Sequence, residues 1–178
     1  MRPALNGSIV GQTNGIDAFD YEPSGAQRLT DEREVEIEGR VVPLPASYLE
    51  ALRRMEGRGV WLRILRPDEY RVPELPGFPS NLAIWRPAKL PAAKALFVKS
   101  LIPAEDRGEA GPDLTGIIPF GDDLGRTWIC WDPNKPGPNG EWAICFVDQN
   151  AGDELAYAGT SDLLQVLVHY APDPEFIT

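Results

Sequence analysis

Two apolar segments flank a turn-rich stretch within residues 117–157, and this is the clearest pattern in the chain. Thr127 to Trp131 and Trp142 to Val147 predict β-strands, and the Pro, Gly and Asn residues between them favour a turn. Because side chains alternate between the two faces of a strand, both faces of this pair are apolar. Either the chain itself covers both faces or one face is exposed to a partner. We favour coverage, by helices on one face and by the N-terminal residues on the other.

The alternation of polar and apolar positions marks further elements. Arg33 to Val42 alternates at period two, which predicts an edge strand or a hairpin that turns at Gly39 and is protected by its charged face. The other predicted elements are a helix from Pro45 to Gly57 with an apolar stripe at Tyr48, Leu49, Leu52 and Met55, a strand from Val60 to Leu65, short helices at Leu82 to Trp85 and Ala92 to Phe97, strands at Ile117 to Phe120 and Leu155 to Ala158, and a final helix capped by Thr160 or Ser161 and stopped by Pro172.

The start of the chain differs in composition from the rest. Residues 1–27 are rich in Gly, Asn, Ser and Pro, which is typical of an arm or loop. A length of 178 residues suits one domain, which we place at residues 28–178. The N-terminal segment lacks the apolar core of a secretory signal, and no apolar run is long enough to span a bilayer. We therefore expect a cytoplasmic protein that has no membrane partner.

Charge is unevenly distributed in a chain whose formal net charge is -10. Residues 101–178 hold 14 acids and three bases. This acidic third repels phosphate backbones and suits a basic partner, so we expect no nucleic-acid ligand. Residues 51–100 carry the opposite excess, with ten bases and four acids. We expect the arginines there to pair with the acidic third; they are Arg53, Arg54, Arg58, Arg63, Arg66 and Arg71.

Few side chains offer chemistry. Asp122 and Asp123 form a carboxylate pair suited to a metal or to acid–base work, but no histidine lies nearby and a turn with solvated carboxylates is favoured. His169 is the only histidine, and near the end of the final helix it interacts favourably with the helix dipole. Cys130 and Cys145 become neighbours if the two strands pair, which allows a disulfide, but we favour two buried free thiols. The sequence predicts no catalytic residue, metal site or cofactor.

The five tryptophans offer apolar contact area. Most of them alternate with aliphatic residues in predicted strands, so we expect them in the core. Trp131 is the one that we expect to be partly exposed, because it lies beside Asp132 at the predicted end of its strand. Since tryptophan is enriched at binding hot spots, Trp131 is a candidate contact residue.

Several short motifs follow one another between Val41 and Tyr170. They are Leu44-Pro45-x-x-Tyr48 opening a helix, a stop at Gly57 to Gly59, Leu62-Arg63-Ile64-Leu65 followed by Pro67-Asp68-Glu69, Ile118-Pro119-Phe120-Gly121-Asp122, a strand ending in Asp132, a strand start at Gly140-Glu141-Trp142, and Ser161-Asp162-Leu163-Leu164 in the final helix. This order resembles the SUKH superfamily, which includes fungal cell-wall-synthesis regulators and many bacterial immunity proteins. The Pro-Phe-Gly-Asp element carries most of the weight, and the long N-terminal arm and proline-rich middle depart from the family pattern.

The resemblance implies an α+β fold, with a mostly antiparallel sheet and helices packed on it, and no enzymatic activity. Bacterial members neutralise a cognate toxin, so we expect an immunity protein that occludes a basic toxin domain. The candidate partner-binding residues are Asp122, Asp123, Trp131, Asp132, Asp148, Asp153 and Glu154. Two alternatives stay open: a non-enzymatic regulatory or scaffolding module like the fungal relatives, and an enzyme that acts through Asp122 and Asp123.

Overall fold

The computed structural model of the chain describes residues 32–54, 61–64, 81–103, 106, 112–123, 126–168 and 170–172. The predicted N-terminal arm, the glycine-rich stop at Gly57 to Gly59 and His169 lie outside these residues. The elements are, in chain order, β1 (Glu34–Ile37), β2 (Arg40–Pro43), α1 (Ala46–Arg54), β3 (Trp61–Ile64), β4 (Asn81–Ile84), α2 (Leu90–Ser100), β5 (Ile118–Asp122), β6 (Thr127–Pro136), β7 (Trp142–Asp148), β8 (Glu154–Tyr157), α3 (Leu163–Leu167) and β9 (Tyr170–Pro172), with short 3-10 helices at Pro87–Lys89, Pro138–Gly140 and Gln149–Ala151.

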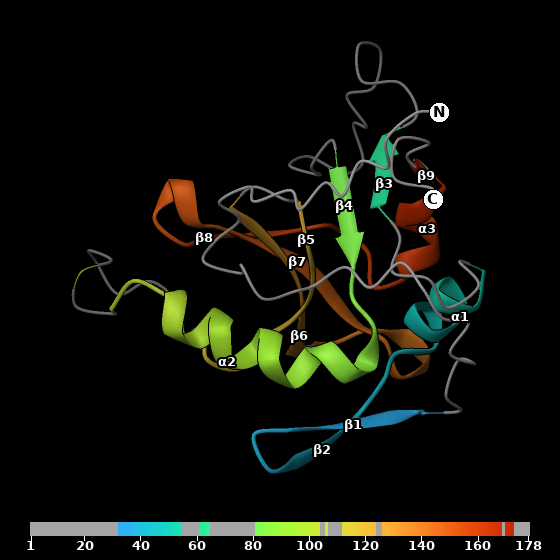
Figure 1. The fold of residues 1–178 in the computed structure, drawn as a ribbon, viewed down its shortest axis with the longest axis horizontal. Coiled ribbons are helices and arrows are strands. Elements are labelled where there is room, and N and C mark those ends of the chain that lie inside the picture. Colours follow the sequence, from blue (N-terminus) through green and yellow to red (C-terminus); the bar gives the residue numbers. More distant parts are fainter. Residues whose placement is uncertain are drawn as a thin grey trace, which may run out of the picture.

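Seven strands form one sheet in the order β8-β7-β6-β5-β4-β3-β9 (Figure 1). Each pair of neighbours in this sheet is antiparallel. Strands β5 to β8 are consecutive in the chain and adjacent in space, which antiparallel pairing through short turns allows. Together with the helices that pack on it, this sheet confirms the predicted α+β class.

The central strands are buried on both faces, as their apolar residues on both sides predict. From β6, Ile129 and Trp131 belong to one core cluster, whereas Trp128 and Cys130 belong to a second cluster. The first cluster also holds side chains from α1, α3 and the hairpin, and the second holds Phe97 of α2. Strands β6 and β7 therefore keep their apolar side chains inside the protein.

Strands β1 and β2 form the predicted hairpin. The register pairs Ile37 with Arg40, so the turn has two residues, Glu38 and Gly39. Both have positive φ, 52° and 73°, which matches the twist of a type I′ turn and suits glycine at the second position. On the inner side of the hairpin, Ile37 is buried and Val35 packs against the first core cluster.

Helix α2 contacts the hairpin through β1 and the large sheet through β5, and it lies between the two in Figure 1. This position explains why the helix is apolar on most of its sides. Its Lys94 is only 2% exposed and donates from Nζ to the backbone carbonyls of Thr115 and, at 2.7 Å, Ile117. Burial lowers the pKa of Lys94. The helix predicted at Ala92 to Phe97 is thus confirmed and is longer than predicted.

The predicted short helix at Leu82 to Trp85 is wrong. This segment forms strand β4, in which Leu82 and Ile84 are buried. The strand pairs with β3 on one side and with β5 on the other. Pairing on both sides satisfies its backbone, and this tertiary context outweighs the weak local preference.

The predicted boundaries of the final helix are also wrong. Asp162 caps α3, because its Oδ1 accepts a hydrogen bond from the Leu164 backbone N–H at 2.9 Å. The hydroxyl of Thr160 instead accepts from the backbone N–H of Asp162, at 3.1 Å. Pro172 ends strand β9 rather than a helix, since the chain returns to the sheet beside β3.

The Pro-Phe-Gly-Asp element has a clear structural basis in β5. Phe120 is fully buried and stacks on Trp131, with 4.2 Å between ring centroids. Gly121 lies at a register shift in the pairing of β5 with β6. A Cβ atom at Gly121 would collide with the backbone carbonyl oxygen of Ala83 on β4. Only glycine lets these two strands approach so closely.

A buried carboxylate connects the starts of two helices. Glu141, just before β7, accepts hydrogen bonds from the Ser47 backbone N–H at 2.8 Å and from the Ser47 hydroxyl at 2.7 Å. Ser47 lies in the first turn of α1, where backbone N–H groups have no partner within the helix. The Ser47 hydroxyl in turn accepts from the backbone N–H of Leu163, the first residue of α3, at 3.1 Å. The Glu141 carboxylate and the Ser47 hydroxyl together fix the starts of α1 and α3 relative to β7.

We expect Glu141→Gln to lower the free energy of unfolding by about 1–3 kcal/mol, because it removes a charged acceptor from two buried donors. Ser47→Ala is expected to lower it by about 1–2 kcal/mol. The double variant should lose less than the sum, since the two residues share hydrogen bonds. Urea denaturation measures all three, with Glu34→Gln on the exposed hairpin as a control. Additive losses would contradict a shared network.

Gly121→Ala should destabilise the fold by about 2–3 kcal/mol, because the new methyl group has no space beside the Ala83 carbonyl. Gly116→Ala is the matched control: its Cβ would meet only the Asn134 side-chain amide, at 3.2 Å, and that exposed side chain can move. Thermal unfolding followed by circular dichroism compares them. Equal melting temperatures for the two variants would contradict the close approach of β4 and β5.

Candidate interaction surface

The structure brings three of the predicted contact residues together at one end of the large sheet. Asp148 ends β7 and is the register partner of Thr127 on β6 and of Glu154 on β8. Asp123 follows β5, and its backbone N–H bonds to the Thr127 carbonyl at 3.1 Å. Asp123, Asp148 and Glu154 therefore lie along the ends of neighbouring strands, and we call them the sheet-end acids.

Turn geometry holds two of the sheet-end acids in place. Asp123 Oδ1 accepts from the Thr127 backbone N–H at 3.0 Å, and Asp148 Oδ1 accepts from the Asn150 backbone N–H at 2.8 Å. Both side chains are half-buried, whereas Glu154 is exposed. Arg126, also exposed, lies beside them, since its carbonyl accepts from the Gln149 N–H. The sheet end is thus acidic on balance, and its carboxylates sit on ordered strand ends.

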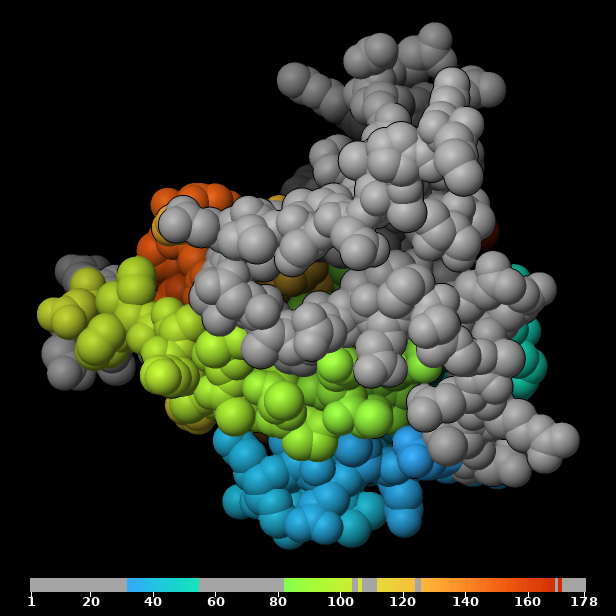
Figure 2. Space-filling model, viewed as in Figure 1, coloured from blue at the N-terminus to red at the C-terminus, as the bar shows by residue number. Residues whose placement is uncertain are grey.

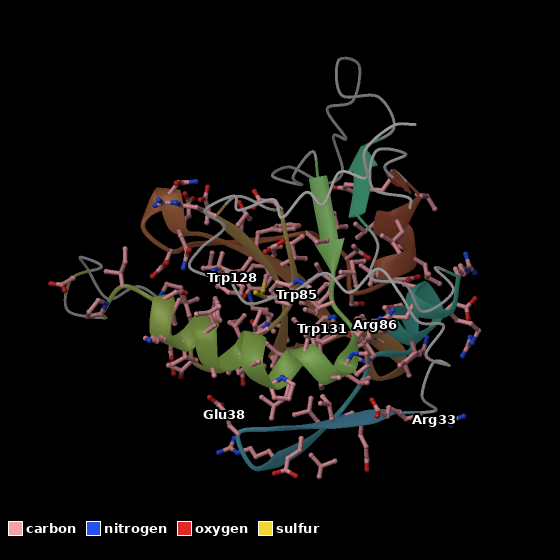
Figure 3. The ribbon with its side chains drawn as sticks, viewed as in Figure 1. Arg33, Glu38, Trp85, Arg86, Trp128 and Trp131 are labelled. Atoms are coloured by element: carbon pink, nitrogen blue, oxygen red, sulfur yellow. The ribbon has the colours of Figure 1, made fainter. Side chains whose placement is uncertain are left out.

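The other four predicted contact residues are buried, and this corrects the prediction for them. Asp122, Asp132 and Asp153 are 4%, 5% and 3% exposed, and Trp131 is 1% exposed. Trp131 was expected at a strand end, but β6 continues to Pro136, so the indole lies in the middle of the sheet. It packs edge-on against Tyr48 as well as stacking on Phe120, and Figure 3 shows it in the interior.

The buried carboxylates serve the fold. Asp132 accepts from the Tyr157 hydroxyl at 2.6 Å and from the Asn134 backbone N–H at 3.0 Å, which ties β6 to β8 across β7. Burial, with the hydrogen bond to Asp132, raises the pKa of Tyr157. Asp153 Oδ2 accepts from the Ile102 backbone N–H at 2.6 Å and so anchors the segment that follows α2. Asp132 and, through Oδ2, Asp153 thus accept hydrogen bonds within the protein, and their burial closes both to a partner in this conformation.

Among the described residues, Arg53 and Arg54 pair within their own helix, and the predicted pairing with the acidic third is not seen for them. Arg53 and Arg54 both form ion pairs with Glu50, one turn earlier in α1. This spacing favours local pairs on a helix surface. The side chains of Arg58, Arg63, Arg66 and Arg71 lie outside the described residues. At least part of the basic charge is therefore neutralised without the acidic third.

The two cysteines are neighbours, as predicted. Cys130 on β6 and Cys145 on β7 are register partners, and both are buried free thiols. Burial raises the pKa of both thiols. A protonated, enclosed thiol is a poor nucleophile and a poor metal ligand. Within the residues described by the structure, no three His, Cys, Asp or Glu side chains gather closely enough to hold a metal ion.

The hairpin presents a second acidic surface that the predicted contact residues did not include. Glu34 and Glu36 on β1 face the same side as Val41 and Pro43 on β2, because Glu34 pairs with Pro43 and Glu36 with Val41. All four are exposed, and we call them the hairpin outer face. The period-two glutamates are visible in the sequence, where they predict only the protection of an exposed strand face.

No family model, curated protein or solved structure matches the chain. Among the helices of the described residues, none is both long enough and apolar enough to cross a bilayer.

We expect both thiols to resist Ellman's reagent in the folded protein and to react once it is unfolded. Because burial raises their pKa, raising the pH from about 7 to about 9 should leave the folded protein unreactive, whereas an exposed cysteine ionises near pH 8.5. Stopped-flow absorbance at the two pH values, with and without guanidinium, measures this. A rate that rises with pH in the folded protein would contradict the buried pair.

Proposed function

We propose that this protein is an immunity protein of the bacterial cytoplasm that binds a cognate toxin domain and neutralises it by occluding the toxin's working surface. The sheet-end acids carry the proposal: Asp123, Asp148 and Glu154 offer carboxylates on ordered strand ends, where they need no reorganisation before binding. The SUKH-like order of motifs supplies the functional class, and the antiparallel α+β architecture is the one that this resemblance implies.

The charge of the sheet end selects the partner. Acidic residues arranged on one surface accelerate encounter with a basic surface and discourage acidic or phosphate-rich ones. Many toxin domains act on nucleic acids through basic clefts, so a basic toxin cleft is the complementary partner. Binding that blocks such a cleft needs no catalytic residue, metal or cofactor in the inhibitor.

The test is co-expression with the product of the neighbouring toxin gene. We expect the chain to restore growth and to co-purify with the toxin domain. If it does neither, the immunity function fails; co-purification with host proteins and no protection would favour the regulatory or scaffolding alternative.

A charge-removal variant locates the contact. Asp123→Asn, Asp148→Asn and Glu154→Gln together remove three charges and keep the side-chain oxygens that the turns require. We expect the association rate at low salt to fall about tenfold or more with little change in dissociation. Surface plasmon resonance measures both rates. Two single variants are compared as a matched control. Glu154→Gln changes the charge by one unit at the sheet end, and Gln165→Lys makes the same change at an exposed position on α3. Equal effects of these two would mean that net charge, rather than the sheet end, guides the toxin.

A further inference from the structure

The hairpin outer face is a sheet surface without a cover among the described residues. Its inner side packs on α2 and the first core cluster, but Glu34, Glu36, Val41 and Pro43 point the other way. Val41 is 65% exposed. In Figure 2 the hairpin, coloured blue, forms one end of the molecule beyond α2. An isolated two-stranded sheet is only marginally stable in water, so packing against α2 keeps the hairpin and its outer face ordered.

The basic and acidic residues of the hairpin strands lie on opposite faces. Arg40 is the register partner of the inward-facing Ile37. Arg33 continues the ladder, since its carbonyl accepts from the Leu44 N–H at 2.8 Å, and alternation places it on the same side as Ile37. Figure 3 places Arg33 and Glu38 at opposite ends of β1. Both arginines of the hairpin therefore lie on its inner side, and the outer face is left with glutamates.

The outer glutamates lack the neutralisation that Glu50 has on α1. A basic residue directly opposite a glutamate would stabilise the hairpin, but Glu34 and Glu36 lie opposite Pro43 and Val41. Among the described residues, neither glutamate makes an ion pair, whereas Glu50 on α1 pairs with two arginines. Within the part of the chain that the structure describes, neither this charge nor the exposed valine is covered.

We infer that the hairpin outer face is a docking surface for a basic protein segment that carries an apolar side chain to cover Val41. Lysine or arginine side chains would pair with Glu34 and Glu36 at the rim, while the apolar contact excludes water at the centre, the usual division of roles in a protein interface. The inference does not rest on the proposed function, because it is argued from the hairpin alone and requires no toxin.

The probe is a short flexible peptide of Lys, Val and Gly, titrated into the isotopically labelled protein and followed by NMR. We expect saturable shifts at the amides of Glu34, Glu36 and Val41 that weaken as salt rises from about 20 to about 300 mM. A peptide with Glu in place of Lys should produce none. If the Lys peptide leaves the hairpin amides unchanged, or shifts only other regions, the inference is overturned.

Paired variants separate a docking surface from general charge attraction. Glu34→Gln with Glu36→Gln should weaken peptide binding roughly threefold to tenfold at low salt, and Val41→Thr should weaken it further. Asp148→Asn with Glu154→Gln removes the same charge at the sheet end and should leave hairpin binding unchanged. Equal weakening by the two double variants would overturn the inference. Since no toxin is used, failure here leaves the immunity test intact, and failure of growth rescue leaves hairpin binding intact.

Discussion

The fold depends on a single buried carboxylate that connects parts of the chain far apart in sequence. Glu141 accepts two hydrogen bonds from Ser47, 94 residues earlier, and Ser47 accepts one from Leu163. A carboxylate that is 7% exposed needs such donors, because an unpaired buried charge is strongly destabilising. The same contacts satisfy N–H groups that α1 and α3 cannot satisfy themselves. The helices, the hairpin that leads into α1 and the sheet are positioned together as a result.

The protein divides its acidic residues between two uses. Asp132, Glu141 and Asp153 are buried and accept hydrogen bonds that join distant segments. The sheet-end acids and the hairpin glutamates remain at the surface, and the hairpin glutamates have no basic partner among the described residues. The excess negative charge of the chain is therefore only partly a surface property. A partner is proposed to meet the surface acids. The buried acids join distant segments of the fold that carries them.

The sequence predicted local features well where one element determines them. The period-two pattern and Gly39 predicted an edge strand or a hairpin, and the two apolar strands predicted that Cys130 and Cys145 would be neighbours if the strands paired; the structure shows the hairpin and the pairing. The sequence did not predict burial that depends on residues far away in the chain. Trp131 is central because β6 extends to Pro136 and packs with Tyr48, and Asp132 is buried because Tyr157 reaches it from β8. A carboxylate beside a turn looks the same in sequence whether it is solvated or buried, so the candidate site was only partly predictable.

The central proposal is that the carboxylates at the surface of the fold, rather than the buried ones, meet a partner. Hydrogen exchange of the free protein and of its complex with the proposed toxin domain tests this most directly. We expect slower exchange on binding at residues 148–154 of the sheet end, with α1 and α3 unchanged. Slower exchange confined to the outer surfaces of α1 and α3, with the sheet end unaffected, would contradict this proposal.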